Sequence, residues 1–146
     1  MKILFICHAN LCRSFMAQEI LKQLLPQAQV FSRGLYVNPS WTVPPKVLAF
    51  LAKHHLMPSP HQPVQLAPAD LETADFIFCM EKTHLDKLTD QFAQYTDKLW
   101  LLADYAFGKE ETIQDPIGLQ GAEFDKQANY LLKAVTAAAQ RLQKND

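Results

Sequence analysis

A cysteine and an arginine, separated by five residues near the start of the chain, carry its clearest chemical signal. They bound a segment that leads from an apolar run into a helical pattern and consists of Cys7, His8, Ala9, Asn10, Leu11, Cys12, Arg13 and Ser14. The backbone N–H groups of such a loop, with the partial positive charge of a helix N-terminus, bind an anion the size of phosphate. The sequence therefore predicts a phosphate-binding loop after the first strand.

The side chains of this loop suit nucleophilic chemistry at phosphorus. Arg13 presents a planar fork of donors that binds two phosphate oxygens at once. We expect Cys7 to be ionised at neutral pH, because a helix N-terminus and a nearby arginine stabilise a thiolate. Ser14, one residue beyond the arginine, can donate its hydroxyl to the sulfur and stabilise it as a leaving group.

The same residues also allow a structural interpretation, in which Cys7 ends a strand as a small apolar side chain and Arg13 opens a helix. A Cys-x5-Arg pattern alone is weak, so its position between strand and helix carries the argument. A zinc site is disfavoured, because Cys7 and Cys12 are spaced more widely than most ligand pairs and no second cysteine pair follows. We therefore expect no metal at this loop.

Short β-rich runs alternate with longer helical patterns, and no internal repeat interrupts them. This alternation predicts one α/β domain over residues 1–146, with a four-stranded parallel sheet and helices on both faces. Strands are expected at residues 2–7, 30–32, 74–80 and 98–102. Helices are expected at residues 15–25, 45–54, 83–88 and from Phe124, where apolar side chains recur at intervals of three and four. The anion loop then lies at the edge where open parallel sheets bind ligands.

Composition and charge narrow the classes of partner. With 49% hydrophobic residues, the chain can bury a hydrophobic core. Its formal net charge of -1 gives no overall positive potential that would attract nucleic acid or an anionic membrane. The apolar run at the N-terminus is too short for a signal peptide. Three cysteines are few and odd in number, which argues against a framework of disulfide bonds. Free thiols favour a reducing compartment, so we expect a cytoplasmic location.

Taken together, these features resemble the low-molecular-weight protein tyrosine phosphatase family, whose loop reads Cys-x-Gly-Asn-x-Cys-Arg-Ser-Pro. The loop positions that fit are Cys7, Asn10, Cys12, Arg13 and Ser14. Further landmarks in family order are Met16-Ala17, Ser32-x-Gly34, Ala74-Asp75, Met80-Glu81-x-x-His84 and Asp115-Pro116. The resemblance covers essentially the whole chain.

The resemblance implies hydrolysis of phosphotyrosine in proteins through a phosphocysteine, without a cofactor. Cys7 would attack phosphorus while Asp115 protonates the leaving phenol, and Asp115 would then activate water. The substrate would be bound by the loop residues His8, Ala9, Asn10, Leu11 and Cys12, with Arg13 as clamp, and by Trp41 on the loop that walls the substrate slot. Glu81 and Asp86, two rival acids, are expected on the solvated face of a helix.

The chain departs from the family pattern at several positions without losing a reacting group. Ala9 replaces a loop glycine, Phe15 a proline, His55 a glycine after the second helix, and His61-Gln62-Pro63-Val64 a His-Arg-x-Arg segment. These changes are expected to affect rate and stability more than the type of reaction.

Two other functions remain open at this point. Related proteins on this fold reduce arsenate with two further cysteines; Cys79 stands near one of those positions, but no cysteine follows it. The second alternative is a phosphoprotein-binding module with little turnover, which the joint presence of Cys7, Arg13 and Asp115 disfavours.

Two loop positions bear on selectivity and regulation. Arginine phosphatases of the family carry Thr at the position of Leu11, so an apolar side chain there favours an aromatic phosphoester. Cys12 lies in the same short loop as Cys7 and predicts a redox-sensitive site, because a nearby thiol traps a sulfenic acid as a disulfide.

Overall fold

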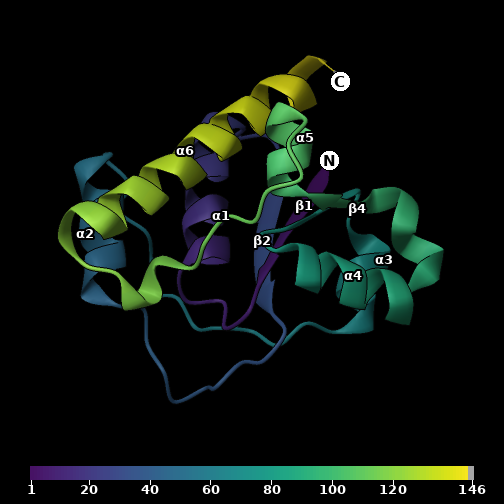
Figure 1. Cartoon of the computed structure of the whole chain (residues 1–146), viewed down its shortest axis with the longest axis horizontal. Coiled ribbons are helices and arrows are strands. Elements are labelled where there is room, and N and C mark those ends of the chain that lie inside the picture. The colour runs from purple at the N-terminus through teal and green to yellow at the C-terminus, as the bar shows by residue number, and fades with distance from the viewer. Residues whose placement is uncertain (145–146) are drawn as a thin grey trace.

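A computed structural model describes residues 1–144 and arranges them as a four-stranded parallel sheet with helices on both faces (Figure 1). The strands are β1 (Lys2–Cys7), β2 (Gln29–Gly34), β3 (Phe76–Cys79) and β4 (Leu99–Leu101), in the spatial order β2-β1-β3-β4. All three strand pairs are parallel. The predicted fold class is confirmed.

The central strand β1 has no solvated face. Its residues Ile3 to Ile6 are fully buried, as its nearly continuous apolar sequence predicts for a strand covered on both sides. Successive side chains point to opposite faces, so Ile3 and Phe5 join one hydrophobic core while Leu4 and Ile6 join the other.

Two sets of helices build these cores. The core that contains Ile3 and Phe5 is completed by α1 (Arg13–Leu24), α2 (Pro45–Lys53), α5 (Leu102–Phe107) and α6 (Gly121–Lys144). The opposite core takes Leu71 from α3 (Pro68–Thr73) and Leu88 from α4 (Lys82–Gln91). The predicted apolar stripe of the last helix, which includes Leu131, Val135 and Leu142, is buried. None of the described helices is long and apolar enough to cross a bilayer.

Several element boundaries differ from the sequence prediction. The helices α3 and α5 were not predicted, because each spans only six residues and so shows less than two turns of periodicity. Strand β2 is longer than expected, so Gly34 lies inside it rather than in the loop that follows. Helix α1 begins at Arg13 rather than at residue 15, which places Arg13 and Ser14 in its first turn.

The strand order creates one position suited to a ligand. From β1 the chain passes to β2 on one side and later to β3 on the other, so the direction of winding changes between β1 and β3. The loops that follow these two strands diverge at their C-terminal ends, where open α/β sheets bind ligands. The predicted anion loop follows β1, and Met80 and Glu81 follow β3.

Candidate active site

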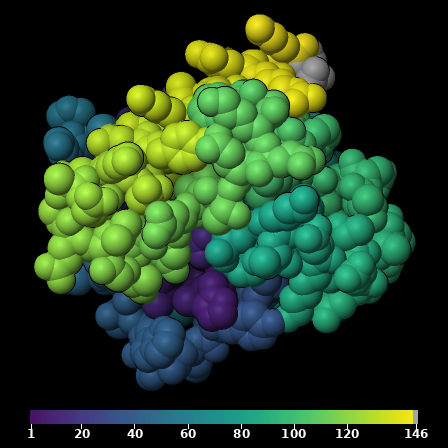
Figure 2. All heavy atoms as spheres, viewed as in Figure 1, coloured from purple at the N-terminus to yellow at the C-terminus, as the bar shows by residue number. Residues whose placement is uncertain are grey.

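The predicted anion loop bridges the end of β1 and the start of α1. Two backbone hydrogen bonds join it to the segment after β2: Leu35 N donates to Cys7 O at 3.1 Å, and Tyr36 N donates to His8 O at 2.8 Å. Figure 2 shows purple atoms of this N-terminal segment at the surface, between blue, teal and yellow-green segments from later in the chain. A substrate can therefore reach the loop from this face.

Asn10 gives the loop its bend. Its backbone lies in the left-handed region at φ 61, which Asn tolerates better than most residues. The side-chain amide donates to Ser14 Oγ at 2.8 Å and to Ser32 Oγ at 2.9 Å, while its oxygen accepts from Val64 N at 3.0 Å. The Asn10 carbonyl oxygen lies 2.8 Å from His61 Nε2. The side chain is thus buried and engaged in shaping the loop.

Cys7 and Ser14 meet as the sequence predicts. Cys7 Sγ lies 2.9 Å from Ser14 Oγ, and both residues are buried. The Ser14 oxygen already accepts from Asn10, so its hydroxyl hydrogen is available to the sulfur. The contact suits an anionic sulfur.

Arg13 is the largest fully buried side chain of the site, with 2% of its surface exposed. Its Nη1 donates to Ile113 O at 2.9 Å, and its Nη2 lies 3.3 Å from Glu81 Oε2 and 3.5 Å from Asp115 Oδ2. Arg13 and Asp115, which the sequence predicts as clamp and acid, are therefore neighbours. Arg13 Nε is buried and has no hydrogen-bond partner among the described residues. A buried donor of this kind needs an acceptor, which an oxygen of a bound oxyanion would supply.

Glu81 does not lie on a solvated helix face, so that expectation is wrong. Its carboxylate contacts Arg13 and also lies 3.0 Å from His84 Nε2. Burial lowers the pKa of His84, so the neutral ring donates Nε2–H to Glu81. Sequence reasoning missed this role because Glu81 directly precedes α4, where an acidic residue is ordinarily a solvated helix-start residue. Asp86 is exposed, as expected.

Asp115 begins a single turn of 3-10 helix, η2 (Pro116–Gly118). Its Oδ1 accepts from Ile117 N at 3.1 Å, and its Oδ2 faces Arg13. One carboxylate oxygen is thus held by the local turn while the other is directed at the anion loop.

Strand β2 supports the loop through Gly34. A Cβ atom at this position would lie 3.0 Å from both Ala9 C and Asn10 N. Only glycine allows this approach without displacing the loop backbone. The roles of Gly34 and of Ser32 were not assigned from the sequence, although their Ser-x-Gly spacing was the available signal.

The departures from the family pattern are accommodated. Ala9 does not adopt the left-handed conformation that glycine would favour, since Asn10 and His55 are the non-glycine residues with positive φ in the described chain. Phe15 stacks on His61 with ring centroids 4.2 Å apart, and His61 in turn contacts Asn10. The stacked Phe15–His61 pair and the backbone N–H of Val64 thus brace the loop through Asn10.

The remaining predicted loop residues divide between the rim and the interior. His8 is exposed, and its ring centroid lies 4.9 Å from that of Tyr36. Leu11 is buried at 3% exposure. Trp41 is 53% exposed on the segment between β2 and α2, and its backbone donates to Asn38 O at 3.1 Å. The contact between Trp41 and a substrate ring stays a prediction.

The other two cysteines have different surroundings. Burial, with the nearby charges of Asp115 and Cys7, raises the pKa of Cys12 to about 12. Burial alone raises the pKa of Cys79 to about 12. Cys79 lies in the core that contains Ile6, whereas Cys7 belongs to the core on the other face of the sheet. Cys79 is therefore separated from Cys7 by the sheet, which disfavours a disulfide shuttle between them.

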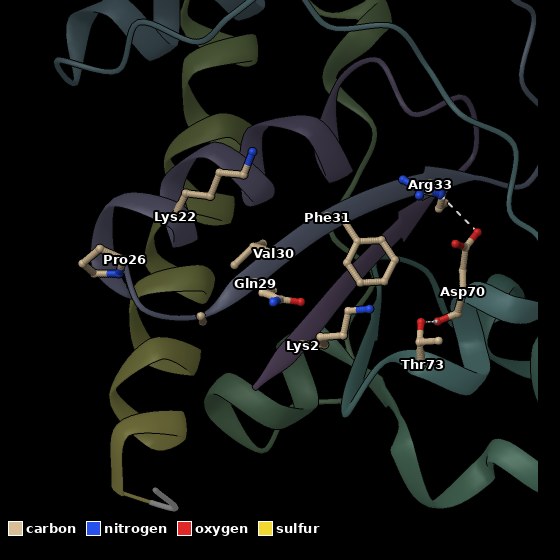
Figure 3. Close-up of a pocket in the computed structure, with 10 residues that line it drawn as sticks. Lys2, Lys22, Pro26, Gln29, Val30, Phe31, Arg33, Asp70 and Thr73 are labelled. Atoms are coloured by element: carbon tan, nitrogen blue, oxygen red, sulfur yellow. Dashed lines mark hydrogen bonds and ion pairs between the residues drawn. The ribbon is translucent and has the colours of Figure 1, made fainter.

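A separate cavity of about 660 Å³ runs along the edge strand β2 (Figure 3). It is lined in part by Lys2, Phe31 and Arg33, and Arg33 Nε lies 3.1 Å from Asp70 Oδ2. None of the residues predicted as catalytic lines it. Within residues 1–144, no group of three or more His, Cys, Asp or Glu side chains is arranged to hold a metal ion.

Comparison with known proteins gives consistent matches. A family model described as low molecular weight phosphotyrosine protein phosphatase matches residues 2–146. The protein-arginine-phosphatase of Bacillus subtilis (strain 168) is 30% identical over 122 residues, covering 81% of each chain. The low molecular weight protein-tyrosine-phosphatase PtpB of Staphylococcus epidermidis is 33% identical over 118 residues, covering 81% of this chain and 82% of that one. A crystal structure of a low molecular weight phosphotyrosine phosphatase from Vibrio cholerae O395 superposes with a TM-score of 0.90 at 28% identity, over 99% of this chain and 98% of that chain.

Proposed function

The chain belongs to the low molecular weight phosphotyrosine protein phosphatase family, and on this premise we propose that it hydrolyses phosphotyrosine in proteins through a phosphocysteine on Cys7. One observation carries the proposal. Arg13, at the end of the anion loop that Cys7 begins, lies 3.5 Å from Asp115 and keeps a buried Nε donor free of partners among residues 1–144. This arrangement supports Cys7 as nucleophile, Arg13 as clamp and Asp115 as acid around one bound oxyanion.

The first step transfers the phosphoryl group to sulfur. The Cys7 thiolate attacks phosphorus as the bond to the phenolic oxygen breaks, and Asp115 gives its proton to that oxygen. Arg13 and the loop N–H groups hold the three equatorial oxygens, so charge stabilisation and alignment supply most of the acceleration. Glu81 fixes the guanidinium for this task.

The second step returns the enzyme to its starting state. Asp115, now ionised, takes a proton from water as the water oxygen attacks phosphorus, and the sulfur leaves as a thiolate that accepts a hydrogen bond from Ser14. Inorganic phosphate is released. The cycle consumes one water and needs no cofactor.

Phosphotyrosine is the substrate we favour over phosphoarginine, although one relative is a protein-arginine-phosphatase. Leu11 stands where the family's arginine phosphatases carry Thr. Exposed apolar side chains at Tyr36, Trp41 and Ile117 offer contact surface for an aromatic ring. The three cysteines are free, which supports our proposal of a reducing, cytoplasmic setting.

The test compares phosphate release from phosphotyrosine, phosphoserine and phosphoarginine peptides, together with arsenate reduction, under reducing and metal-free conditions. We expect phosphotyrosine to be turned over fastest. Cys7→Ser should abolish turnover in a folded protein, and Arg13→Lys should be nearly as damaging because an ammonium cannot replace the planar fork. Binding of a phosphotyrosine peptide by the wild type without turnover would instead identify a binding module.

A further inference from the structure

The structure assigns a positioning role to Lys46, in the first turn of α2: we propose that its ammonium group holds the segment carrying Asp115 in the geometry needed for proton transfer. This inference rests on the proposed function, in which Asp115 is the general acid. Lys46 belongs to none of the sequence motifs of the site and lies far along the chain from both Cys7 and Asp115.

The ammonium group of Lys46 donates hydrogen bonds to the backbone of the segment that follows Asp115. Its Nζ donates to the carbonyl oxygen of Ile117 and, at 2.7 Å, to that of Leu119. It also lies 5.4 Å from the ring centroid of Phe124, in the first turn of α6. One charged side chain of α2 therefore holds both η2 and the entry to α6 through charge-assisted contacts.

A second anchor holds the chain directly before Asp115. Ile113 N donates to Met80 O at 2.8 Å, and Ile113 O accepts from Arg13 Nη1 at 2.9 Å. The backbone is thus held on both sides of Asp115, by Arg13 at the end of the anion loop on one side and by Lys46 of α2 on the other. In Figure 1 the segment that leaves α5 runs across the molecule toward α2 before it enters α6.

Apolar packing fixes this segment at only a few points. Between Gly108 and Gln120 only Ile113 and Pro116 are buried, Asp115 and Leu119 are half-buried, and the other residues face solvent. On the C-terminal side of the acid, the polar contacts of Lys46 therefore add to the packing of Pro116 and of Leu119, which lies against the core. Proton transfer needs the carboxyl within about 2.6–3.2 Å of the leaving oxygen, and a displacement of about 1 Å costs up to ~10²-fold in rate.

A competing account is that the charge of Lys46 acts directly on the anion loop. The charge does reach the loop, where it opposes the rise in the pKa of Cys12. The two accounts differ in their dependence on Asp115. A positioning residue has no effect once the acid is removed, whereas a direct electrostatic effect persists.

The decisive experiment measures the rate of phosphoenzyme formation with a series of aryl phosphates whose phenols differ in acidity. We expect Lys46→Met to slow poor leaving groups about 10-fold or more, within the ~10²–10⁴-fold that a general acid contributes, and to leave good leaving groups nearly unchanged. Lys46→Arg should restore most of the loss. On an Asp115→Asn background, Lys46→Met should add no further loss, because both changes remove the same step.

Lys53→Met is the matched control, since Lys53 is on the same helix and lines the same cavity of about 500 Å³ beside Lys46. It should leave the leaving-group dependence unchanged. An equal loss across all phenols, or a loss that persists on the Asp115→Asn background, would overturn the positioning role. If Lys46→Met does not fold, Lys46→Gln provides the same comparison. Absence of turnover in the wild type would defeat the proposed function instead, so the two failures are distinguishable.

Discussion

The hydroxyl oxygen of Ser14 lies 2.9 Å from the sulfur of Cys7, and both side chains are buried. Asn10 donates to the same oxygen, which leaves the Ser14 hydrogen directed at the sulfur. In the proposed mechanism, the Ser14 hydroxyl therefore stabilises the anionic sulfur of Cys7 twice in each catalytic cycle, first as nucleophile and then as leaving group.

Ser14→Ala should lower kcat for an aryl phosphate about 10- to 100-fold, because a hydrogen bond to a charged group is worth about 1.5–3 kcal/mol. Burst kinetics would show which of the two steps slows. Ser32→Ala is the control, since Ser32 accepts from Asn10 at 2.9 Å but belongs to β2. Equal losses in the two variants would mean that Ser14 acts only by holding Asn10.

Gly34→Ala should reduce kcat/KM more than about tenfold and lower the free energy of unfolding by about 1–3 kcal/mol, because the new methyl group forces the loop backbone away. The added Cβ would meet Ala9 C and Asn10 N at 3.0 Å and Val37 Cγ2 at 2.7 Å. Adding Val37→Ala relieves only the side-chain contact. Recovery of activity in that double variant would show that the loop backbone is not the critical neighbour.

His55→Gly should raise the free energy of unfolding by about 0.5–1 kcal/mol, since a non-glycine residue in the left-handed conformation costs about 1–2 kcal/mol, partly offset by the greater freedom of glycine in the unfolded chain. His55 has φ 63 and follows α2. Its N–H donates to Ala52 O at 3.0 Å and that of Leu56 to Leu51 O at 2.8 Å, the pattern of a Schellman helix end.

Chemical denaturation measures this gain. His54→Gly provides the comparison, because His54 precedes the turn with φ -99 and should lose stability when replaced by glycine. A loss in His55→Gly as large as that in His54→Gly would contradict the strain argument.

Stability should fall as the pH drops below about 6.5, before carboxylates begin to titrate. Burial lowers the pKa of His61 and of His84 from the ordinary value of 6.5. Above pH 6.5 both histidines are neutral in the folded and in the unfolded chain, so their contribution to the free energy of unfolding is fully present. Below pH 6.5 the histidines of the unfolded chain bind protons more readily than those of the folded chain, so this contribution is lost. Denaturation between pH 7.5 and 5.5 should show this slope, and His61→Gln should reduce it. An unchanged slope in that variant would remove His61 from the account.

Peroxide should inactivate the wild type in a way that dithiothreitol reverses, with Cys12 trapping oxidised Cys7 as a disulfide. Attack requires the Cys12 thiolate, and burial raises the pKa of Cys12 to about 12. Recovery should therefore be more complete when oxidation is carried out at higher pH. Cys12→Ala should lose activity irreversibly, and full recovery of this variant would exclude Cys12 as the resolving thiol.

The part of the fold that could be predicted is the part with strong local patterning. Strand β1 has the predicted bounds, because six consecutive residues suited to a buried parallel strand precede a polar loop. The apolar stripe of α6 recurs from Phe124 to Leu142 and was equally clear. Helices α3 and α5 were not predicted because tertiary packing, rather than their own sequence, stabilises so short a helix.

The position of the anion loop could be predicted from the sequence alone, since Cys7, Arg13 and Ser14 lie between one strand and one helix and are arranged by local geometry. The distant groups that meet these residues could be identified only in the folded chain. Glu81 reaches Arg13 because β3 lies beside β1, and Asp115 reaches it because Ile113 and Lys46 hold the chain between α5 and α6 over the loop. These contacts join residues far apart in sequence, and no local period encodes them: they depend on the order in which the strands assemble and on where the connecting segments are anchored.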